Sequence, residues 1–261
     1  MRAGLRWIAL LGLLGPGLLL GQTPRLTVYY YDRLPYYGNL NQRPGGMLLD
    51  IARLVFDEAG VACDFEETPA KRIPENLKAR VNACSIGWFM TREREATYTF
   101  SAEPIYQDHP FCALFNQASR SRIPANPTVK NLLQGNLQLG MIEGFAYGDW
   151  LEANVAKFGP RVEKVSIGEN SDNMYRMLLG GRFDYMFIGF EEATYILANN
   201  PEFSQRLGLI GVPDAPKGNL RYIMFSRGVD PGILEKVNAA IPRIRQGRRY
   251  RQIISMLAVE R

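Results

Sequence analysis

The stretch CSIGWFMTREREATYTFS, residues 84–101, holds the residue types in this chain that are best suited to binding chemistry. Arg94 carries a planar guanidinium that matches a carboxylate with two parallel N–H donors and stays charged at any relevant pH. Trp88 and Phe89 precede it and offer large aromatic faces. A glutamate flanks the arginine on each side, so the residues alone also fit a surface ion pair on a short helix. The stretch therefore indicates either a solvated charged turn or the mouth of a binding site.

Residues for metal or nucleophilic chemistry are few. His109 is the only histidine, and no Cys-x-x-Cys pair is formed by Cys63, Cys84 or Cys112. The chain therefore has almost no residues that could bind zinc or haem. His109 and Cys112 lie three residues apart in a strand-like segment, which puts their side chains on opposite faces. In an oxidising compartment at most one cysteine pair can form, and the sequence does not choose it. We expect no metal and no cofactor.

The first 21 residues have the layout of a secretory signal peptide. Arg2 and Arg6 precede an apolar run from Trp7 to Leu20, which is shorter than the roughly 20 residues that span a membrane. Cleavage after Gly21 is expected, and an uncleaved anchor is the alternative. Without the two arginines, the formal net charge of +5 falls by two.

A basic cluster, RIRQGRRYR, lies near the C-terminus. Such a cluster can attract a phosphate backbone or an anionic membrane surface. No nucleic-acid motif accompanies it, so a solvated helix face is the preferred interpretation. We expect no nucleic-acid partner.

Hydrophobic periodicity predicts strands that alternate with helices. RLTVYYY (25–31) is rich in β-branched and aromatic residues and predicts a strand, and MLLDIARLVFDEAG (47–60) has the apolar spacing of a helix that ends at Gly60. Further strands are expected in VACDFEE, NACSIG and HPFCALF, and a short helix in IPENLKARV. This alternation indicates βαβ units and a mainly parallel sheet.

The same order repeats over about residues 117–215. Strands are expected in NLQLGMI, VEKVSIG, FDYMFIG and RLGLIGV, and helices in YGDWLEANVAKF, EEATYILANN and SDNMYRMLLGG, the last with Ser171 as its N-cap. A strand, LRYIMFSRG, and two helices follow. Asp230 and Pro231 predict the start of the first of these helices, and Pro242 is expected to kink or end it.

The last two helices need a sheet to cover, and the first unit has few helices of its own. We therefore predict one lobe from residues 25–115 plus 220–261 and a second lobe from residues 117–215. The polar, proline-containing string NQASRSRIPANPT has the composition of a connection between the two.

In this order of elements and in several strings, nearly the whole mature chain resembles the family 3 extracellular solute-binding proteins. The strings are GGMLLDIARLVFDEAG after a PYY loop, MTREREATYTFS with the pattern T-x-x-R-x-x-x-x-x-F-S, LGMIEGFAYG and LLGGRFDYMFIG. Within that family the chain looks closer to less characterised proteobacterial members with GWF before the threonine than to the amino-acid binders themselves. The resemblance implies an α/β fold of the two-lobed, type II periplasmic-binding-protein kind. Each lobe would be a mainly parallel sheet flanked by helices, with a ligand cleft between the lobes.

The resemblance also implies that Arg94 clamps a ligand carboxylate, because the family uses the arginine of this motif in that way. The chain departs from the amino-acid binders elsewhere. Where they have small hydroxyl residues, it has Gly87, Trp88 and Phe89, and in the second lobe Phe145, Ala146 and Tyr147. Their acid that pairs with an α-ammonium group falls on Gly189, with Glu191 and Glu192 just beyond. The amino-acid pocket is therefore not reproduced.

Aromatic residues replace that pocket and suit a flat, apolar or cationic ligand. Core packing is the alternative for each of them. The amides that begin the helix expected over 148–157 are a further possible anion site. We expect these ligand-binding residues: Arg94, Tyr36, Trp88, Phe89, Gly87, Phe145, Tyr147 and Glu191.

The preferred function is that of a periplasmic receptor, a monomer, which closes on a small molecule carrying a carboxylate or other anionic group. It would deliver this ligand to a membrane transporter permease or present it to a sensor. A binding module for a periplasmic redox enzyme is an alternative. A dehydratase or lyase that uses Glu143, Glu191 or Asp32 as acid or base is a weaker one, because no arrangement of nucleophile and base can be read from the spacing. We expect a binding protein, not an enzyme.

The charge and apolar layout of the first residues give a direct prediction. The secreted protein should begin after Gly21, because a signal peptidase removes a segment of this layout on export. N-terminal sequencing of periplasmic material tests this, and a sequence that begins at Met1 would contradict it.

Overall fold

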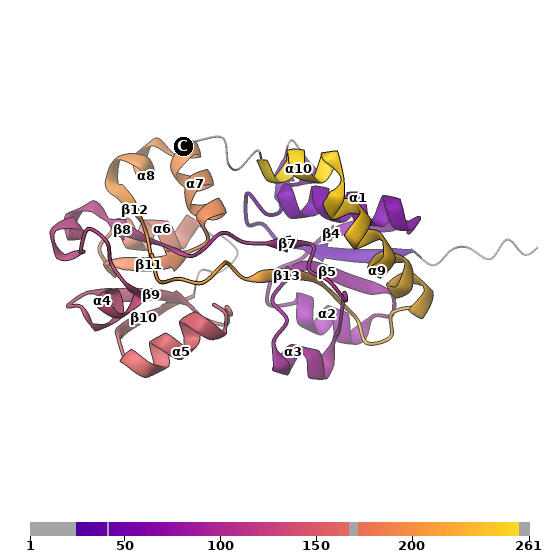
Figure 1. Cartoon of the computed structure of the whole chain (residues 1–261), viewed down its shortest axis with the longest axis horizontal. Coiled ribbons are helices and arrows are strands. Elements are labelled where there is room, and N and C mark those ends of the chain that lie inside the picture. The colour runs from indigo at the N-terminus through magenta and orange to yellow at the C-terminus, as the bar shows by residue number, and fades with distance from the viewer. Residues whose placement is uncertain (1–24, 41, 167–171, 256–261) are drawn as a thin grey trace, which may run out of the picture.

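The computed structural model describes residues 25–40, 42–166 and 172–255. They form two α/β lobes joined by two extended segments that lie side by side, as Figure 1 shows. The predicted N-cap Ser171 and the signal segment lie outside the described residues. Among the described helices, none has the length and apolar character needed to cross a membrane.

The first lobe contains a sheet in the order β4-β1-β5-β13-β6, with β7 paired to β13. β1, β4 and β5 are parallel, and β13 is antiparallel to its neighbours β5, β6 and β7. A small antiparallel pair, β2 and β3, stands apart from this sheet. The strands are β1 (Leu26–Tyr30), β2 (Gly38–Leu40), β3 (Arg43–Gly45), β4 (Cys63–Glu67), β5 (Ala83–Trp88), β6 (Thr99–Phe100), β7 (Tyr106–Gln107) and β13 (Leu220–Phe225).

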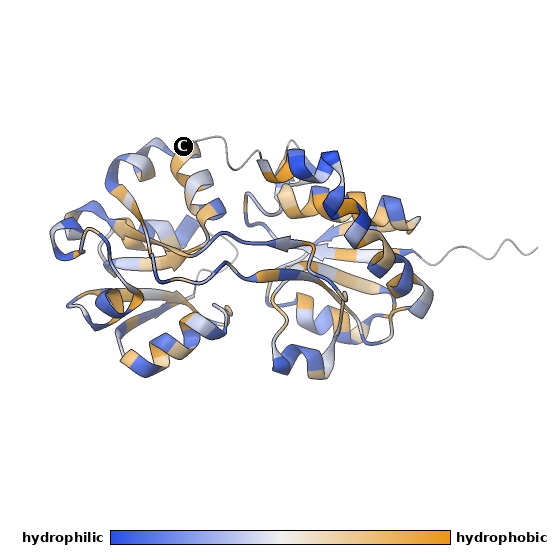
Figure 2. Cartoon of the chain, viewed as in Figure 1, coloured by the Kyte–Doolittle hydropathy of each residue, from blue (hydrophilic) through white to orange (hydrophobic). Residues whose placement is uncertain are grey.

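Helices from both ends of the chain cover the first sheet. The helix α9 packs against α1, and both contribute to one buried apolar cluster with β1 and β5. Gly60 ends α1 in the left-handed conformation, at φ 61°, as the sequence predicts. The helices are α1 (Met47–Ala59), α2 (Ile73–Ala79), α3 (Arg92–Thr97), α9 (Pro231–Gln246) and α10 (Arg248–Ser255). Figure 2 shows hydrophobic residues along α1 and hydrophilic ones on α3 and α10.

Asp230 caps α9 as predicted, since its carboxylate accepts the backbone N–H groups of Gly232 and Ile233. The prediction that Pro242 could end this helix is wrong, because α9 continues through it to Gln246. The buried Val237 and Ile241 before the proline and the partly buried Ile244 after it hold the helix along the core and offset the missing hydrogen bond.

The second lobe contains a sheet in the order β10-β9-β11-β8-β12. β9, β10 and β11 are parallel, and β8 is antiparallel to β11 and β12. The strands are β8 (Cys112–Asn116), β9 (Gln138–Ile142), β10 (Arg161–Val165), β11 (Tyr185–Ile188) and β12 (Leu207–Gly211). The helices are the 3₁₀ helix η1 (Gln117–Arg122), α4 (Val129–Gln134), α5 (Asp149–Phe158), α6 (Asp172–Leu179), α7 (Phe190–Asn199) and α8 (Pro201–Arg206).

In each sheet, one strand runs against the others, and in each case it is the strand that follows a crossing between the lobes. The chain enters β8 and β13 from the side of the sheet where the parallel strands have their carboxyl ends. These two strands therefore run in the opposite direction. The predicted boundary of the first lobe at residue 115 is wrong for β8, which pairs with β11 and β12 in the second sheet. The strand-like pattern of 109–115 gave no sign of which sheet it joins.

The two crossing segments touch through their backbones. The Asp108 N–H donates to the carbonyl of Asn219 at 3.0 Å, and the side chain of Gln107 donates from Nε2 to the carbonyl of Gly218 at 3.2 Å. A Cβ atom on Gly218 would overlap the carbonyl oxygens of Asp108 and His109. Glycine at this position therefore permits the close approach of the two segments.

Gly218→Ala should lower the free energy of unfolding by about 1–3 kcal/mol, because the atoms that would clash belong to backbone. Gly211→Ala is the matched control, since a Cβ there meets nothing within 4 Å. Denaturant unfolding of both variants measures the difference. Equal stabilities would mean that the crossing segments are not closely packed in solution.

Candidate ligand-binding site

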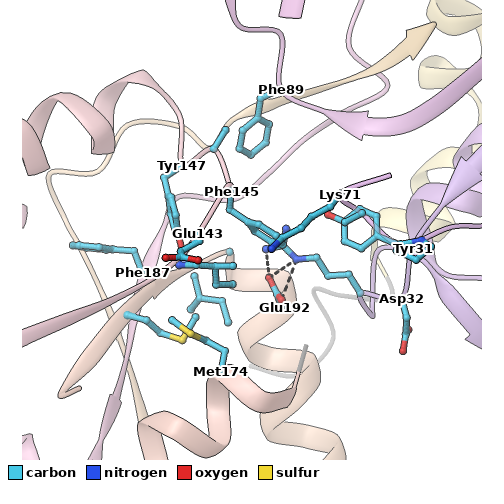
Figure 3. A pocket seen from close by; sticks show the side chains of 18 of the residues that line it. Tyr31, Asp32, Lys71, Phe89, Glu143, Phe145, Tyr147, Met174, Phe187 and Glu192 are labelled. Carbon is cyan, nitrogen blue, oxygen red and sulfur yellow. Dashed lines mark hydrogen bonds and ion pairs between the residues drawn. The ribbon is translucent and has the colours of Figure 1, made fainter. Parts of the chain in front are cut away.

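A cavity of about 590 Å³ lies between the two lobes (Figure 3). Its walls come from the segments that follow β1, β4 and β5 in the first lobe and β9, β10 and β11 in the second. The carboxyl ends of the parallel strands of both sheets therefore meet at one space. Ligand sites of α/β proteins form at such strand ends, and this volume is typical of a small-molecule site.

The second lobe supplies an apolar wall. Residues at the ends of β9 and β11 and on α6 form it: Ile142, Phe145, Tyr147, Met174, Met186 and Phe187. The hydroxyl of Tyr147 accepts the Ile142 N–H at 2.8 Å, which fixes the ring of Tyr147 against β9. Burial raises the pKa of Tyr147 to about 12, so this hydroxyl stays neutral.

The first lobe supplies a more polar wall. Tyr31, Thr68, Lys71, Arg72 and Phe89 belong to it. The hydroxyl of Tyr37 donates to that of Tyr31 at 3.0 Å, and the two ring centroids lie 4.8 Å apart, which holds the Tyr31 ring at the cavity.

An ion pair joins the two lobes inside the cavity. Arg33 donates from Nη2 to Oε2 of Glu192 at 2.6 Å and from Nε to both carboxylate oxygens at 3.1 Å. The two side chains are only 20% and 6% exposed. Tyr175 adds a hydrogen bond to Oε1 of Glu192 at 2.8 Å, and the Arg33 guanidinium lies 5.3 Å from the centre of the Phe145 ring. Glu192 is thus held by partners from both lobes.

A second, deeper ion pair joins β13 to a crossing segment. Arg221 donates from Nε to Asp108 at 2.5 Å and from Nη1 to the carbonyl of Gly87 at 3.0 Å. Its guanidinium also lies 4.2 Å from the centre of the Tyr36 ring and 5.0 Å from that of Phe89. Burial raises the pKa of Asp108 to about 6 against the opposing effect of Arg221, so the pair remains ionised at neutral pH.

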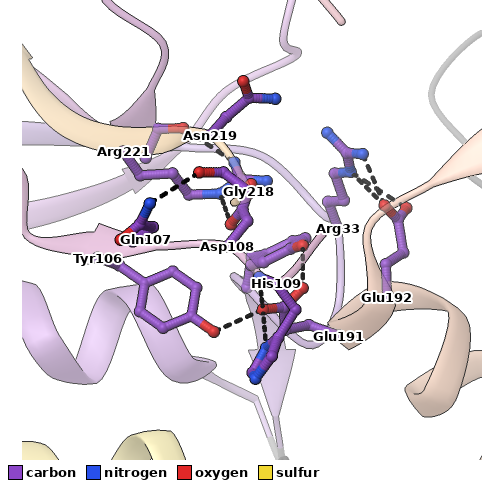
Figure 4. A network of polar contacts seen from close by, with 12 residues as sticks. Arg33, Tyr106, Gln107, Asp108, His109, Glu191, Glu192, Gly218, Asn219 and Arg221 are labelled. Carbon is purple, nitrogen blue, oxygen red and sulfur yellow. Dashed lines mark hydrogen bonds and ion pairs between the residues drawn. The ribbon is translucent and has the colours of Figure 1, made fainter. Parts of the chain in front are cut away.

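Glu191, the neighbour of Glu192 at the start of α7, is fully buried in a polar network (Figure 4). Its Oε1 accepts from the Tyr106 hydroxyl at 2.6 Å and from the His109 N–H at 2.9 Å, and it lies 2.8 Å from the His109 ring nitrogen Nδ1. Tyr36 donates to Oε2 at 3.4 Å. Burial acts to raise the pKa of Glu191, but these donors outweigh it and hold the pKa below its ordinary value.

Arg94 lies beside the cavity wall but is not one of the residues that line it. Its guanidinium stands 4.7 Å from the centre of the Trp88 ring and donates from Nη1 to the carbonyl of Phe89 at 2.9 Å. Within the described residues no carboxylate forms an ion pair with it, although Glu93 and Glu95 flank it in sequence. Burial lowers its pKa from the ordinary value. The alternative of a surface ion pair is therefore not seen.

The eight predicted site residues fall into three groups. Three line the cavity: Phe89, Phe145 and Tyr147. Three support it from behind through the Arg221 and Glu191 networks: Gly87, Tyr36 and Glu191. Two pack on each other at its side: Trp88 and Arg94.

The sequence reasoning missed Arg33, Arg221 and Asp108, and it did not use Glu192. Arg221 gave a usable signal, because a charged residue inside the apolar strand LRYIMF must have a buried partner. Arg33 gave none, since its partner is 159 positions away.

The described part of the chain contains no cluster of His, Cys, Asp and Glu that could hold a metal ion. Cys63, Cys84 and Cys112 are all free thiols. The only histidine hydrogen-bonds Glu191, and the Cys112 thiol lies 3.9 Å from the carbonyl of Pro110, so no pair of nucleophile and base forms between them.

Two α/β lobes, two crossing segments and a cavity lined from both sides define the class of two-lobed binding proteins. The chain belongs to the bacterial extracellular solute-binding proteins, family 3, whose model matches residues 26–256. No curated protein sequence matches it.

Solved structures of similar proteins have the same fold. An arginine-, lysine- and histidine-binding protein from Geobacillus stearothermophilus superposes with a TM-score of 0.70 at 20% identity, over 90% of this chain and 95% of that one. A periplasmic binding protein of an arginine transport system from Legionella pneumophila gives 0.70 at 18% identity, over 89% and 99%. An ancestral amino-acid-binding protein, a precursor of cyclohexadienyl dehydratase, gives 0.67 at 18%, over 89% and 94%.

The buried ion pair between Arg221 and Asp108 gives a stability prediction. Arg221→Met should lower the free energy of unfolding by about 3–5 kcal/mol, because it leaves a buried carboxylate without its partner. A second change, Asp108→Leu, should recover much of that loss, since no uncompensated charge remains.

The matched control is Arg206→Met, which removes the same charge from an exposed pair with Glu202 and should cost less than about 1 kcal/mol. Denaturant unfolding of the variants provides the measurement. An equal, small loss in Arg221→Met and Arg206→Met would show that the Arg221 pair is hydrated in solution.

Proposed function

We propose that this protein is a receptor that closes its two lobes over one small molecule in the cavity between them. The observation that carries the proposal is the cavity itself, whose lining comes in comparable parts from both lobes. A ligand bound there contacts both lobes at once, so it favours the closed arrangement by its differential affinity. The family and the binding proteins among its structural neighbours support this function.

The ligand carries a carboxylate or another anionic group. Arg94 supports this, because it is a half-buried guanidinium without a carboxylate partner among the described residues, and its neighbour Phe89 lines the cavity. A desolvated cation of this kind binds an anion more strongly than an exposed one does. Lys71 and Arg72 add positive charge at the first-lobe wall.

The protein works in the periplasm and delivers its ligand, as a monomer, to a membrane transporter. Membership in an extracellular solute-binding family supports this location, and the Legionella neighbour is described as part of a transport system. A sensor or a periplasmic redox enzyme is the alternative partner. Catalysis is not part of the proposal: Glu191 is fully engaged by its donors, and Glu143 is exposed to water.

Arg94→Ala should weaken binding of the ligand that co-purifies with the protein, after mass spectrometry has identified it. If the guanidinium pairs with the anionic group in a closed cleft, the loss should be roughly 2–5 kcal/mol, which is about 30-fold or more in affinity. Arg94→Lys should recover only part of it, because a single ammonium does not reproduce the paired donors. Titration calorimetry measures these affinities.

Arg92→Ala is the matched control, because Arg92 begins the same helix and is exposed. It should leave affinity unchanged. If Arg94→Ala binds as tightly as wild type, the anion is held elsewhere and Arg94 only supports Phe89. If no ligand co-purifies and small-angle scattering detects no closure with any tested solute, the receptor function itself is refuted.

A further inference from the structure

The carboxylate of Glu192 faces the cavity with its acceptor positions already filled. Arg33 supplies two N–H donors across three contacts of 2.6–3.1 Å, and the Tyr175 hydroxyl supplies another at 2.8 Å. The side chain is 6% exposed. A ligand ammonium that approached Glu192 would have to displace Arg33, which would leave a guanidinium in the cavity wall without its counter-charge.

The other buried carboxylates near the cavity are engaged in the same way. Asp108 accepts from Arg221, and Glu191 accepts from Tyr106, His109 and Tyr36. Gly189 lines the cavity one position before α7, and a Cβ there would lie 2.6 Å from the hydroxyl of Tyr36, so this stretch has no room for a further acidic side chain.

Three remaining carboxylates line the cavity at exposed positions. Asp32 and Glu143 are exposed to water, and Glu67 accepts from the side chain of Asn39. An ion pair with a ligand at such a position is screened by water and contributes little. Partial burial raises the pKa of Asp32, but its side chain remains exposed to water. No buried carboxylate that lines the cavity in the described part of the chain is therefore open to a ligand ammonium.

In contrast to these buried carboxylates, the Arg33 guanidinium keeps one nitrogen that is not engaged by a described residue. Arg33 uses Nε and Nη2 for Glu192, and no described residue accepts a hydrogen bond from its Nη1. The Arg33 side chain is 20% exposed and lines the cavity, so Nη1 can donate to a ligand anion while the pair with Glu192 stays intact. The cavity can thus pair a negative group with a largely buried cation without breaking an internal contact, whereas an ammonium group would meet only carboxylates that are exposed to water.

We propose that the Arg33–Glu192 pair makes the site selective for an anion with an apolar, aromatic or branched body and no ammonium group, and so excludes free α-amino acids. This inference rests on the proposed receptor function and names its ligand class. The apolar body lies against Ile142, Met186 and Phe187, where no polar group needs a partner. Glu192 determines specificity because its acceptors are filled by Arg33 and Tyr175.

The test uses matched probes that differ only in the α-ammonium group. They are 3-phenylpropanoate with L-phenylalanine, 3-(indol-3-yl)propanoate with L-tryptophan, and 4-methylpentanoate with L-leucine. Calorimetry with the wild-type protein should show that at least one acid binds, and that it binds about tenfold or more tightly than its amino acid, because the amino acid must bury an unpaired ammonium.

Two variants test the role of the pair. Arg33→Met removes the partner of Glu192 and opens its carboxylate, so affinity for the amino acid should rise and that for the acid should fall, bringing the two within about threefold. Glu192→Gln removes the carboxylate but keeps Arg33, so the tenfold preference for the acid should persist. Arg206→Met, which removes the same charge from an exposed pair on α8, should behave as wild type.

The inference is overturned if an amino acid binds as tightly as its matched acid, or if Glu192→Gln weakens amino-acid binding selectively. It is also overturned if none of the six probes binds. Binding and closure with the co-purified ligand would then show that the receptor function stands and only the ligand class is wrong. If Arg33→Met does not fold, as its thermal transition will show, the wild-type ratio and Glu192→Gln decide the matter.

Discussion

Two adjacent carboxylates at the start of α7, Glu191 and Glu192, determine how the lobes sit against each other. Both are buried, and a buried carboxylate is tolerated only where donors replace its water. Those donors come largely from outside the second lobe: Tyr36, Tyr106 and Arg33. The observed arrangement of the lobes is therefore fixed by the hydrogen bonds that the first turn of α7 accepts from the first lobe. The cavity is the space that this arrangement leaves.

The same constraint decides what the cavity offers to a ligand. Because the buried charges are already balanced by Arg33 and Arg221, the second-lobe wall presents mainly aromatic and aliphatic surface. The backbone contact between Asp108 and Asn219 keeps the Arg221 pair and the crossing segments in one unit. The Arg221 and Glu191 networks thus act as scaffold behind the cavity, and the second-lobe wall that a ligand meets is largely apolar.

The sequence predicted local structure well and long-range pairing poorly. Helical periodicity located α1, and β-branched and aromatic composition located β1. Gly60 and Asp230 marked a helix end and a helix start through local backbone chemistry. The partner of Arg33 and the sheet that β8 joins depend on contacts between distant segments, which periodicity does not encode. The resemblance predicted the two-lobed fold. It predicted Arg94 as the charged ligand-binding residue, but it did not predict the charged residues that line the cavity.

The ion pair across the lobes contributes little net energy to closure. Opening the cleft would give Arg33 and Glu192 back their water, and hydration of two charges roughly offsets the loss of their attraction. Apolar surface behaves differently, since each Å² removed from water contributes about 25 cal/mol. In the proposed closure over a ligand, contact with the apolar wall around Phe145 and Phe187 would therefore supply the driving force, while the pair would fix the geometry in which that contact forms. Orientation and driving force are supplied by different residues of the same cavity.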